Sequence, residues 1–257
     1  MLRFKNLGSG STGNATLVAA SHDGDSTCLL IDCGLGLKVL DDRLARAGLL
    51  ASQLSGIFIT HEHSDHIGSA RALALRERLP VWMSRGTYAA MNTPDFDGLL
   101  RLACDGVALD FPGLQLMPFT VPHDARGPLQ LTCSNGLAKL GIATDLGHAS
   151  SHVMKHLQGC TSLLLEFNHD TDLLAQSSYP VFLKQRISGD HGHLSNATAL
   201  AIAQNLLPGG LKQLVAAHLS QQNNRPERVL NSLRHLISGG LQVHIASAPE
   251  GTDWLDA

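Results

Sequence analysis

Seven consecutive residues, 60–66, concentrate the side chains that could bind a metal ion. They read Thr-His-Glu-His-Ser-Asp-His, so three imidazoles and a carboxylate fall within six positions. Imidazole and carboxylate groups are common ligands of divalent transition metals. Fourteen histidines in 257 residues leave room for chance clustering. The order H-x-H-x-D-H nevertheless favours a metal site over a surface loop that happens to be rich in histidine.

The apolar run at residues 57–59 comes directly before this stretch and predicts a strand that ends where the ligands begin. The alternation of a strand sends His61 and His63 to one side, while Asp65 and His66 face the other way around the turn. One loop could therefore supply ligands to two metal ions.

Three further candidate ligands each follow an apolar run. His123 follows residues 119–122, Asp145 follows 141–144 and His218 follows 214–217. Taken singly, each fits a partly exposed residue at the end of a strand equally well. Because strand ends can direct side chains into a shared cleft, the four places together favour one common site.

The pattern of apolar and turn-forming residues predicts an α/β chain. No linker, repeat or low-complexity segment divides it, so we expect a single domain over residues 1–257. Five helices are expected, at 37–47, 68–79, 152–157, 196–206 and 226–237, with a further helix and loop within 84–98. Strands with turns are expected between 99 and 144, and individual strands at 2–7, 15–20, 28–32, 56–59, 81–83, 129–133, 137–144, 161–167, 211–217 and 241–246.

Residues 8–13 match the pattern G-x-G-x-x-G, which in another context would indicate a dinucleotide site. Such a site needs a helix directly afterwards, but residues 14–18 read as another strand. We therefore reject that interpretation. The favoured explanation is a tight glycine turn, and the alternative is a backbone loop near the metals that touches a substrate phosphate.

The bulk composition is that of a globular enzyme, with 44% hydrophobic and 16% charged residues. A net charge of −3 gives no overall basic field, so a nucleic-acid partner would be attracted by a local patch or by the metals. The five cysteines contain no C-x-x-C pair, which favours free thiols in a reducing compartment. With no secretion signal or membrane-length apolar run, we expect a cytoplasmic protein without a membrane partner.

At this point the chain resembles the metallo-β-lactamase-fold hydrolases, through the loop at 60–66 and the three later ligands in the order of that family. The resemblance implies a four-layer αβ/βα sandwich with two divalent metal ions, best suited to Zn²⁺, with Mn²⁺ or Fe²⁺ as alternatives. It implies a hydroxide bridging the two ions as nucleophile. One ion would be held by His61, His63 and His123, the other by Asp65, His66 and His218, and Asp145 would bridge them.

Several branches of that superfamily fit poorly. The best-known β-lactamase subclass has a cysteine where Asp145 stands, the glyoxalase-II type has a different segment around its third histidine, and the flavodiiron type usually has an acid in place of His63. The phosphodiesterase and nuclease side remains. There a histidine before a short helix assists the leaving group, and His193 in residues 191–195 is similar. Asp65 would orient or deprotonate the nucleophile.

More closely, the chain resembles the YycJ-like (WalJ) branch. The similar segments are residues 7–14, 121–125, 144–148, 165–170, 192–196 and 217–220. This resemblance implies a DNA exonuclease with nucleic acid as its substrate. A small-molecule hydrolase, acting on a cyclic phosphodiester or a lactone, is the alternative. A non-catalytic metal-binding regulator is disfavoured because no ligand is missing.

Some polar residues near predicted strand ends keep two interpretations. Asp32 either hydrogen-bonds a metal ligand or forms a turn, and Glu166 either orients His193 or is an ordinary strand-end carboxylate. His169 and Asp170 either face the cleft or open a loop, while His148 is a candidate substrate contact. Three arginines follow the loop at 60–66, namely Arg71, Arg76 and Arg78. We expect them to lie on a solvated helix face rather than to form a nucleic-acid-binding surface.

Overall fold

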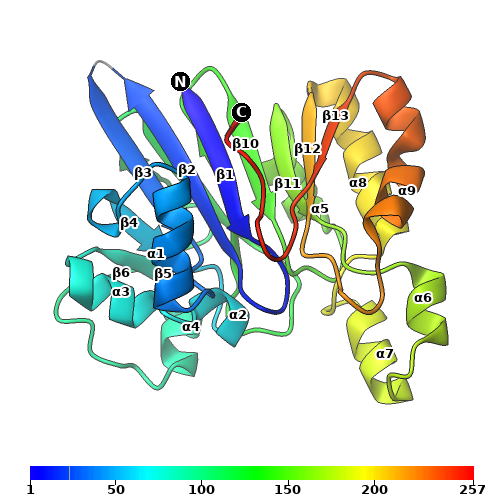
Figure 1. Ribbon diagram of the computed structural model, residues 1–257, viewed down its shortest axis with the longest axis horizontal. Helices are drawn as coiled ribbons and strands as arrows, with labels where there is room; N and C mark the ends of the chain where they lie inside the picture. The colour runs from blue at the N-terminus through cyan, green and yellow to red at the C-terminus, as the bar shows by residue number, and fades with distance from the viewer. Residues whose placement is uncertain (23) are drawn as a thin grey trace.

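Two seven-stranded sheets face one another, and helices cover the outer face of each, as expected for the four-layer sandwich. The computed structural model describes residues 1–22 and 24–257. Figure 1 shows the two sheets side by side, with both termini at the upper edge.

The first sheet has the strand order β14-β1-β2-β3-β4-β5-β6. Its first four strands pair in antiparallel fashion, whereas β3 to β6 run parallel. The strands are β1 (Leu2–Gly8), β2 (Ala15–His22), β3 (Asp25–Ile31), β4 (Gly56–Phe58), β5 (Val81–Ser84), β6 (Leu100–Ala103) and β14 (Leu255–Asp256).

The second sheet has the order β13-β12-β11-β10-β9-β8-β7, and β10 to β13 run parallel. Because β8 and β10 are both antiparallel to β9, they point in the same direction. The strands are β7 (Leu109–Phe111), β8 (Leu114–Thr120), β9 (Leu129–Ser134), β10 (Lys139–Ala143), β11 (Ser162–Glu166), β12 (Gln213–Ala217) and β13 (Gln242–Ile245). The strands β8, β10 and β12 therefore end at one edge.

The helices fall into groups by the face that they cover. The outer face of the first sheet packs against α1 (Leu37–Arg46) and α3 (Ala70–Glu77), with α4 (Arg85–Ala90) beside them. The outer face of the second sheet packs against α5 (Ser151–Leu157), α8 (Asn196–Leu206) and α9 (Pro226–Ser238). Two further helices, α6 (Thr171–Gln176) and α7 (Val181–Ser188), project from the lower right of the sandwich in Figure 1, and α2 (Ser64–Ile67) lies below the sheets.

Strand alternation assigns each apolar side chain to a layer. On β11, Leu164 packs between the two sheets, while Leu163 and Leu165 pack under the outer helices. The layer between the sheets receives side chains from both of them, such as Phe58 and Leu131. This layer is therefore common to the two sheets.

Among the α-helices and strands, four short elements were not predicted: α2, α6, α7 and β14. The expected helix at 68–79 is shorter, since Gly68 separates α2 from α3. Helix α6 buries only Leu174, and every residue of α7 is at least partly exposed. A buried apolar stripe is the signal by which a sequence reveals a helix, so these helices give almost none. Among the described residues, no helix is long and apolar enough to cross a membrane.

The layer between the sheets should dominate stability. Leu131 is fully buried there, whereas Leu137 lies 92% exposed in the β9–β10 turn. We expect Leu131→Ala to lower the free energy of unfolding by about 2–5 kcal/mol because it leaves a cavity. We expect Leu137→Ala to change it by less than about 0.5 kcal/mol. Urea denaturation followed by circular dichroism measures both, and equal effects would contradict this assignment of the core.

Candidate metal centre

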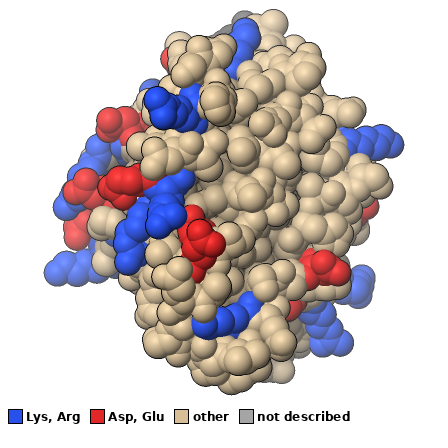
Figure 2. Space-filling view, turned by 90° about the vertical axis from the view of Figure 1, so that its right-hand side faces the viewer, with Lys and Arg blue, Asp and Glu red and all other residues tan. Residues whose placement is uncertain are grey.

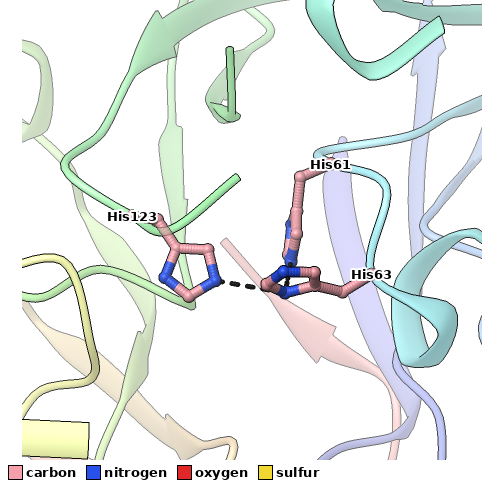
Figure 3. Close-up of side chains that lie close together, drawn as sticks. All are labelled: His61, His63 and His123. Atoms are coloured by element: carbon pink, nitrogen blue, oxygen red, sulfur yellow. Dashed lines mark hydrogen bonds between the residues drawn. The ribbon is translucent and has the colours of Figure 1, made fainter. Parts of the chain in front are cut away.

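Three imidazoles, those of His61, His63 and His123, point toward one another (Figure 3). His63 Nδ1 lies 3.1 Å from His61 Nε2 and 3.3 Å from His123 Nε2. Nitrogens bound tetrahedrally to one Zn²⁺ at 2.0–2.1 Å lie about 3.4 Å from one another. The spacing of these three nitrogens therefore suits a single metal ion.

A second group lies beside the first. Asp65 Oδ2 is 3.6 Å from both His66 Nε2 and His218 Nε2. Asp145 reaches the same two nitrogens, with Oδ2 3.0 Å from His66 and Oδ1 3.5 Å from His218. Asp145 also shares a potential ligand cluster with His61 of the first group. The structure thus brings together all seven predicted ligands, with Asp145 between the two groups.

The donor atoms fit divalent cations. Asp145 Oδ2 and His218 Nε2 are buried, and neither makes a hydrogen bond within the described part of the chain. Buried polar atoms without partners are rare because each one costs free energy. Two cations, one in each group, would satisfy both atoms, so the residues fit a dinuclear centre.

The predicted grouping is observed, but its cause differs from the expected one. The strand β4 ends at Phe58, His63 is the N-cap of α2 and His66 lies within that one-turn helix, so strand alternation does not place these side chains. The helix turns Asp65 and His66 away from His63 and toward the second group. The separation into two groups therefore comes from a helical turn.

Each ligand imidazole that is buried has a partner for its other ring nitrogen. His66 Nδ1 lies 2.8 Å from Asp32 Oδ2, and Asp32 also accepts from the backbone N–H of Thr60. His61 Nδ1 lies 3.0 Å from the Thr60 hydroxyl. His123 Nδ1 lies 3.2 Å from the carbonyl oxygen of Gly192. Such partners fix ring orientation and basicity at metal sites. Of the two roles that the sequence left open for Asp32, the structure shows the hydrogen bond to a candidate ligand.

Glu166 holds two histidines at once. Its Oε1 atom lies 2.7 Å from His193 Nδ1 and 2.9 Å from His218 Nδ1, while Oε2 accepts from the backbone N–H groups of Leu146 and Leu194. Burial opposes ionisation of this carboxyl, but His193 and His218 lower its pKa to about 2. Glu166 therefore orients His193, as one of its two interpretations expected.

The carboxylates stabilise positive charge on the neighbouring imidazoles. Burial alone would lower the pKa of His66, but Asp145 and Asp32 raise it to about 10. Burial opposes the charged form of His218 too, yet Asp145, Asp65 and Glu166 hold its pKa well above the usual value. The second group is thus an environment for cationic charge, whether a proton or a divalent metal ion carries it.

Three residues of the centre lie one or two positions after a strand and have left-handed backbone. The φ angles are 61° at Asp32, 55° at Asp145 and 54° at His218. This conformation is uncommon outside glycine and costs of order 1 kcal/mol per residue. It turns the chain at once, so that a side chain at the end of a strand projects into the cleft.

The glycine-rich turn links β1 to β2, as predicted, and it also contacts the centre. The Ser9 hydroxyl accepts from the backbone N–H of His218 at 2.7 Å. Asn14 Nδ2 donates to Asp65 Oδ2 and lies 3.0 Å from His66 Nε2. Gly34, which follows β3, lies against the same loop. A Cβ atom at Gly34 would overlap the backbone carbonyl of Asp65, so only glycine lets these two backbone segments pack so closely. Sequence reasoning assigned no role to Ser9 or Asn14.

Other nominated residues lie elsewhere. His148 is exposed and contacts the Asp190 carbonyl oxygen, and Asp170 caps α6. His169 is buried, and this burial lowers its pKa. The arginines do not form a free basic face, because Arg76 pairs with Asp41 and Glu77, Arg78 with Asp97, and Arg71 with the Asp95 carbonyl.

The centre opens into a cavity of about 260 Å³. His193 and His218 lie on its wall, together with three residues that sequence reasoning did not single out: Asp124, Tyr179 and Arg186. Asp124 and Arg186 are 62 positions apart in the sequence, so only the fold reveals their pairing.

The carboxylate behind His66 should tune metal binding. We expect Asp32→Asn to lower the affinity for Zn²⁺ about 10- to 100-fold, because the imidazole loses a charged partner. Competition with a chromophoric chelator measures this affinity. Asp110→Asn, at an exposed carboxylate of β7, is the matched control, and equal affinities in the two variants would contradict the role of Asp32.

Comparison with known proteins agrees with this geometry. The family model described as the metallo-beta-lactamase superfamily matches residues 8–208. Exodeoxyribonuclease YycJ of Bacillus anthracis is 33% identical over 241 residues, covering 92% of this chain and 89% of the relative. Exodeoxyribonuclease WalJ of Streptococcus pneumoniae serotype 2 is 31% identical over 230 residues, covering 88% and 84%.

The solved structures show the same fold. The metallo-beta-lactamase fold protein YhfI of Bacillus subtilis has a TM-score of 0.73 at 16% identity, with 99% of this chain and 98% of that one covered. The resemblance to the YycJ-like branch is confirmed, and the histidine and aspartate clusters are typical of the dinuclear site of this fold. The chain therefore belongs to the metallo-β-lactamase superfamily and is a metal hydrolase of that fold.

Proposed function

We propose that this hydrolase cleaves phosphodiester bonds in nucleic acid and acts as a DNA exonuclease. The observation that carries the proposal is a complete histidine and aspartate centre, in a chain whose likeness to two exodeoxyribonucleases extends over about nine-tenths of its length. The seven clustered side chains, together with the histidine that Glu166 contacts, are groups of the kinds that phosphodiester hydrolysis needs.

In this proposal the ligands divide as the geometry groups them. His61, His63 and His123 would hold one ion, and Asp65, His66 and His218 the other, with Asp145 as a ligand shared between them. The imidazole-rich set suits Zn²⁺ best, with Mn²⁺ or Fe²⁺ as alternatives. Two bound ions would lower the pKa of a shared water and stabilise the negative charge of an in-line displacement.

His193 is the proposed general acid. Its Nδ1 atom faces the ionised Glu166, which can only accept a hydrogen bond, so Nδ1 carries a proton. Burial opposes a second proton, but Glu166 and Asp145 raise the pKa of His193. The imidazolium therefore persists to higher pH than for free histidine, and its Nε2–H can protonate a leaving alkoxide.

Asp65 is the proposed partner of the nucleophile. It lies on the cavity wall, and Asn14 Nδ2 donates to its Oδ2 atom at 3.2 Å. Burial opposes its ionisation, but His218 and His66 lower its pKa. Asp65 therefore stays ionised at neutral pH, where a carboxylate can orient an attacking water and accept its proton.

A small-molecule hydrolase remains the second candidate, because the cavity is small and the chain has a net charge of −3. On the face in Figure 2, basic side chains are scattered among acidic ones and form no continuous surface. A cyclic phosphodiester or a lactone would need no such surface. For either substrate we propose a cytoplasmic location, supported by five free cysteines, of which four are buried.

The choice between these functions can be tested with DNA. We expect the Zn²⁺- or Mn²⁺-loaded protein to release mononucleotides from a labelled duplex with a resected end, because the proposed centre attacks terminal phosphodiesters. Gel electrophoresis of the products measures the release. His63→Ala should abolish it by removing a ligand. Turnover of bis(p-nitrophenyl) phosphate without attack on any polynucleotide would favour the small-molecule hydrolase.

The role of His193 has its own test. We expect His193→Ala to retain both metal ions while kcat on DNA falls about 10²- to 10⁴-fold. The loss on bis(p-nitrophenyl) phosphate should be smaller, since p-nitrophenolate leaves without a proton. In the wild type, the rate that depends on this acid should fall as pH rises through the raised pKa of His193. Metal analysis and steady-state kinetics measure these effects, and full activity of the variant on DNA would refute the assignment.

A further inference from the structure

Helix α7 carries an exposed apolar surface beside the metal centre. Phe182 is 71% exposed and Val181 is 70% exposed. The pair α6 and α7 projects from the sandwich at the edge where the site lies, in the lower right of Figure 1. Exposed apolar surface next to a functional site is a common mark of a binding surface.

The same helix also forms a wall of the cavity. Tyr179, just before α7, and Arg186, within it, both line the space in front of the two metal groups. The backbone N–H of His193 donates to the carbonyl oxygen of Ile187 at 2.8 Å. At the other side, Lys184 Nζ donates to the Ala175 carbonyl at the end of α6. The helix is therefore held in a fixed position relative to the proposed acid.

Arg186 compensates a carboxylate at the mouth of the site. Its Nε and Nη2 atoms lie 2.7 and 2.6 Å from Asp124 Oδ2. Asp124 Oδ1 in turn lies 3.4 Å from His123 Nε2. Left alone, this carboxylate would repel a phosphate from the centre. The Arg186 side chain is 62% exposed, so the guanidinium has N–H groups left for an anionic substrate.

Phe182 and Arg186 share one side of α7, since residues four apart on a helix are neighbours. They lie about 6 Å apart along its axis, with Arg186 nearer the centre, since it lines the cavity. The two charged residues of α7, Lys184 and Arg186, are both basic. An aromatic ring next to a cation is the combination that binds single-stranded nucleic acid, by stacking on a base and pairing with a phosphate.

We propose that α7 binds the end of a single nucleic-acid strand as it enters the site. Arg186 contacts a phosphate at the cavity mouth, and Phe182 stacks on an adjoining base. The proposal rests on the proposed function and deepens it, because it names the part of the substrate that is recognised. It also explains how a chain without an overall basic field could hold a polyanion.

The experiment uses the metal-loaded full chain with two substrates, a single-stranded DNA oligonucleotide and bis(p-nitrophenyl) phosphate. For Phe182→Ala we expect the ratio of kcat/KM on DNA to kcat/KM on the small substrate to fall about 5- to 150-fold. Phe182→Trp should keep the ratio within about twofold of the wild type. Leu137→Ala is the matched control, since Leu137 is exposed but lies before β10, at the opposite end from the site.

Arg186→Ala tests the phosphate contact. In the same assay, the slope of log(kcat/KM) on DNA against log salt concentration should become shallower by about 0.7, the value for one phosphate of a single strand. Arg186→Lys should restore part of the slope because it keeps the charge. Circular dichroism melting checks that all variants are folded.

Two results would overturn the proposal. One is a Phe182→Ala protein whose ratio equals that of the Leu137→Ala control. The other is sedimentation of the wild type as a dimer that Phe182→Ala converts to a monomer, which would assign this face to a second copy of the chain. Failure of the proposed function looks different. In that case the wild type hydrolyses bis(p-nitrophenyl) phosphate but no DNA. That result would contradict both the proposed function and the proposal for α7.

Discussion

Three carboxylates, Asp32, Asp145 and Glu166, are buried at one edge of the sandwich with 4% exposure or less. Negative charge removed from water is strongly unfavourable unless positive charge or hydrogen-bond donors surround it. Here imidazoles and backbone N–H groups do so, from His66, His193 and His218 in particular. Once these carboxylates are fixed, the positions and charge states of the surrounding imidazoles follow.

This compensation depends on both sheets. The loop after β4 contributes four candidate ligands from the first sheet, while strands β8, β10 and β12 each contribute one at the same edge of the second. The apolar layer between the sheets sets their separation, and the groups meet only where strands from both sheets end. The long connection between β11 and β12 then adds His193 and α7 to the rim. The core therefore determines the geometry of the chemistry at its edge.

Much of this arrangement could be predicted from the sequence, because its signals are local. The H-x-H-x-D-H order and the polar residues after apolar runs predicted seven candidate ligands, and the structure places these seven residues together. Buried strands are recognisable from the alternation of their side chains. The contacts of Asn14 and of Arg186 could not be predicted, since each joins residues about 50 or more positions apart. Helices α2, α6 and α7 were missed because they bury almost no side chains in the core.

The left-handed backbone at Asp32, Asp145 and His218 has a consequence for how such a protein can change. Glycine at any of these positions would relieve the local conformational energy, but it would remove a side chain from the centre. The same substitution would leave buried partners such as His66 without a compensating charge, which costs more free energy than the strain that it relieves. The strained backbone at these three positions is therefore retained together with the charge balance of the centre, and neither can be changed without the other.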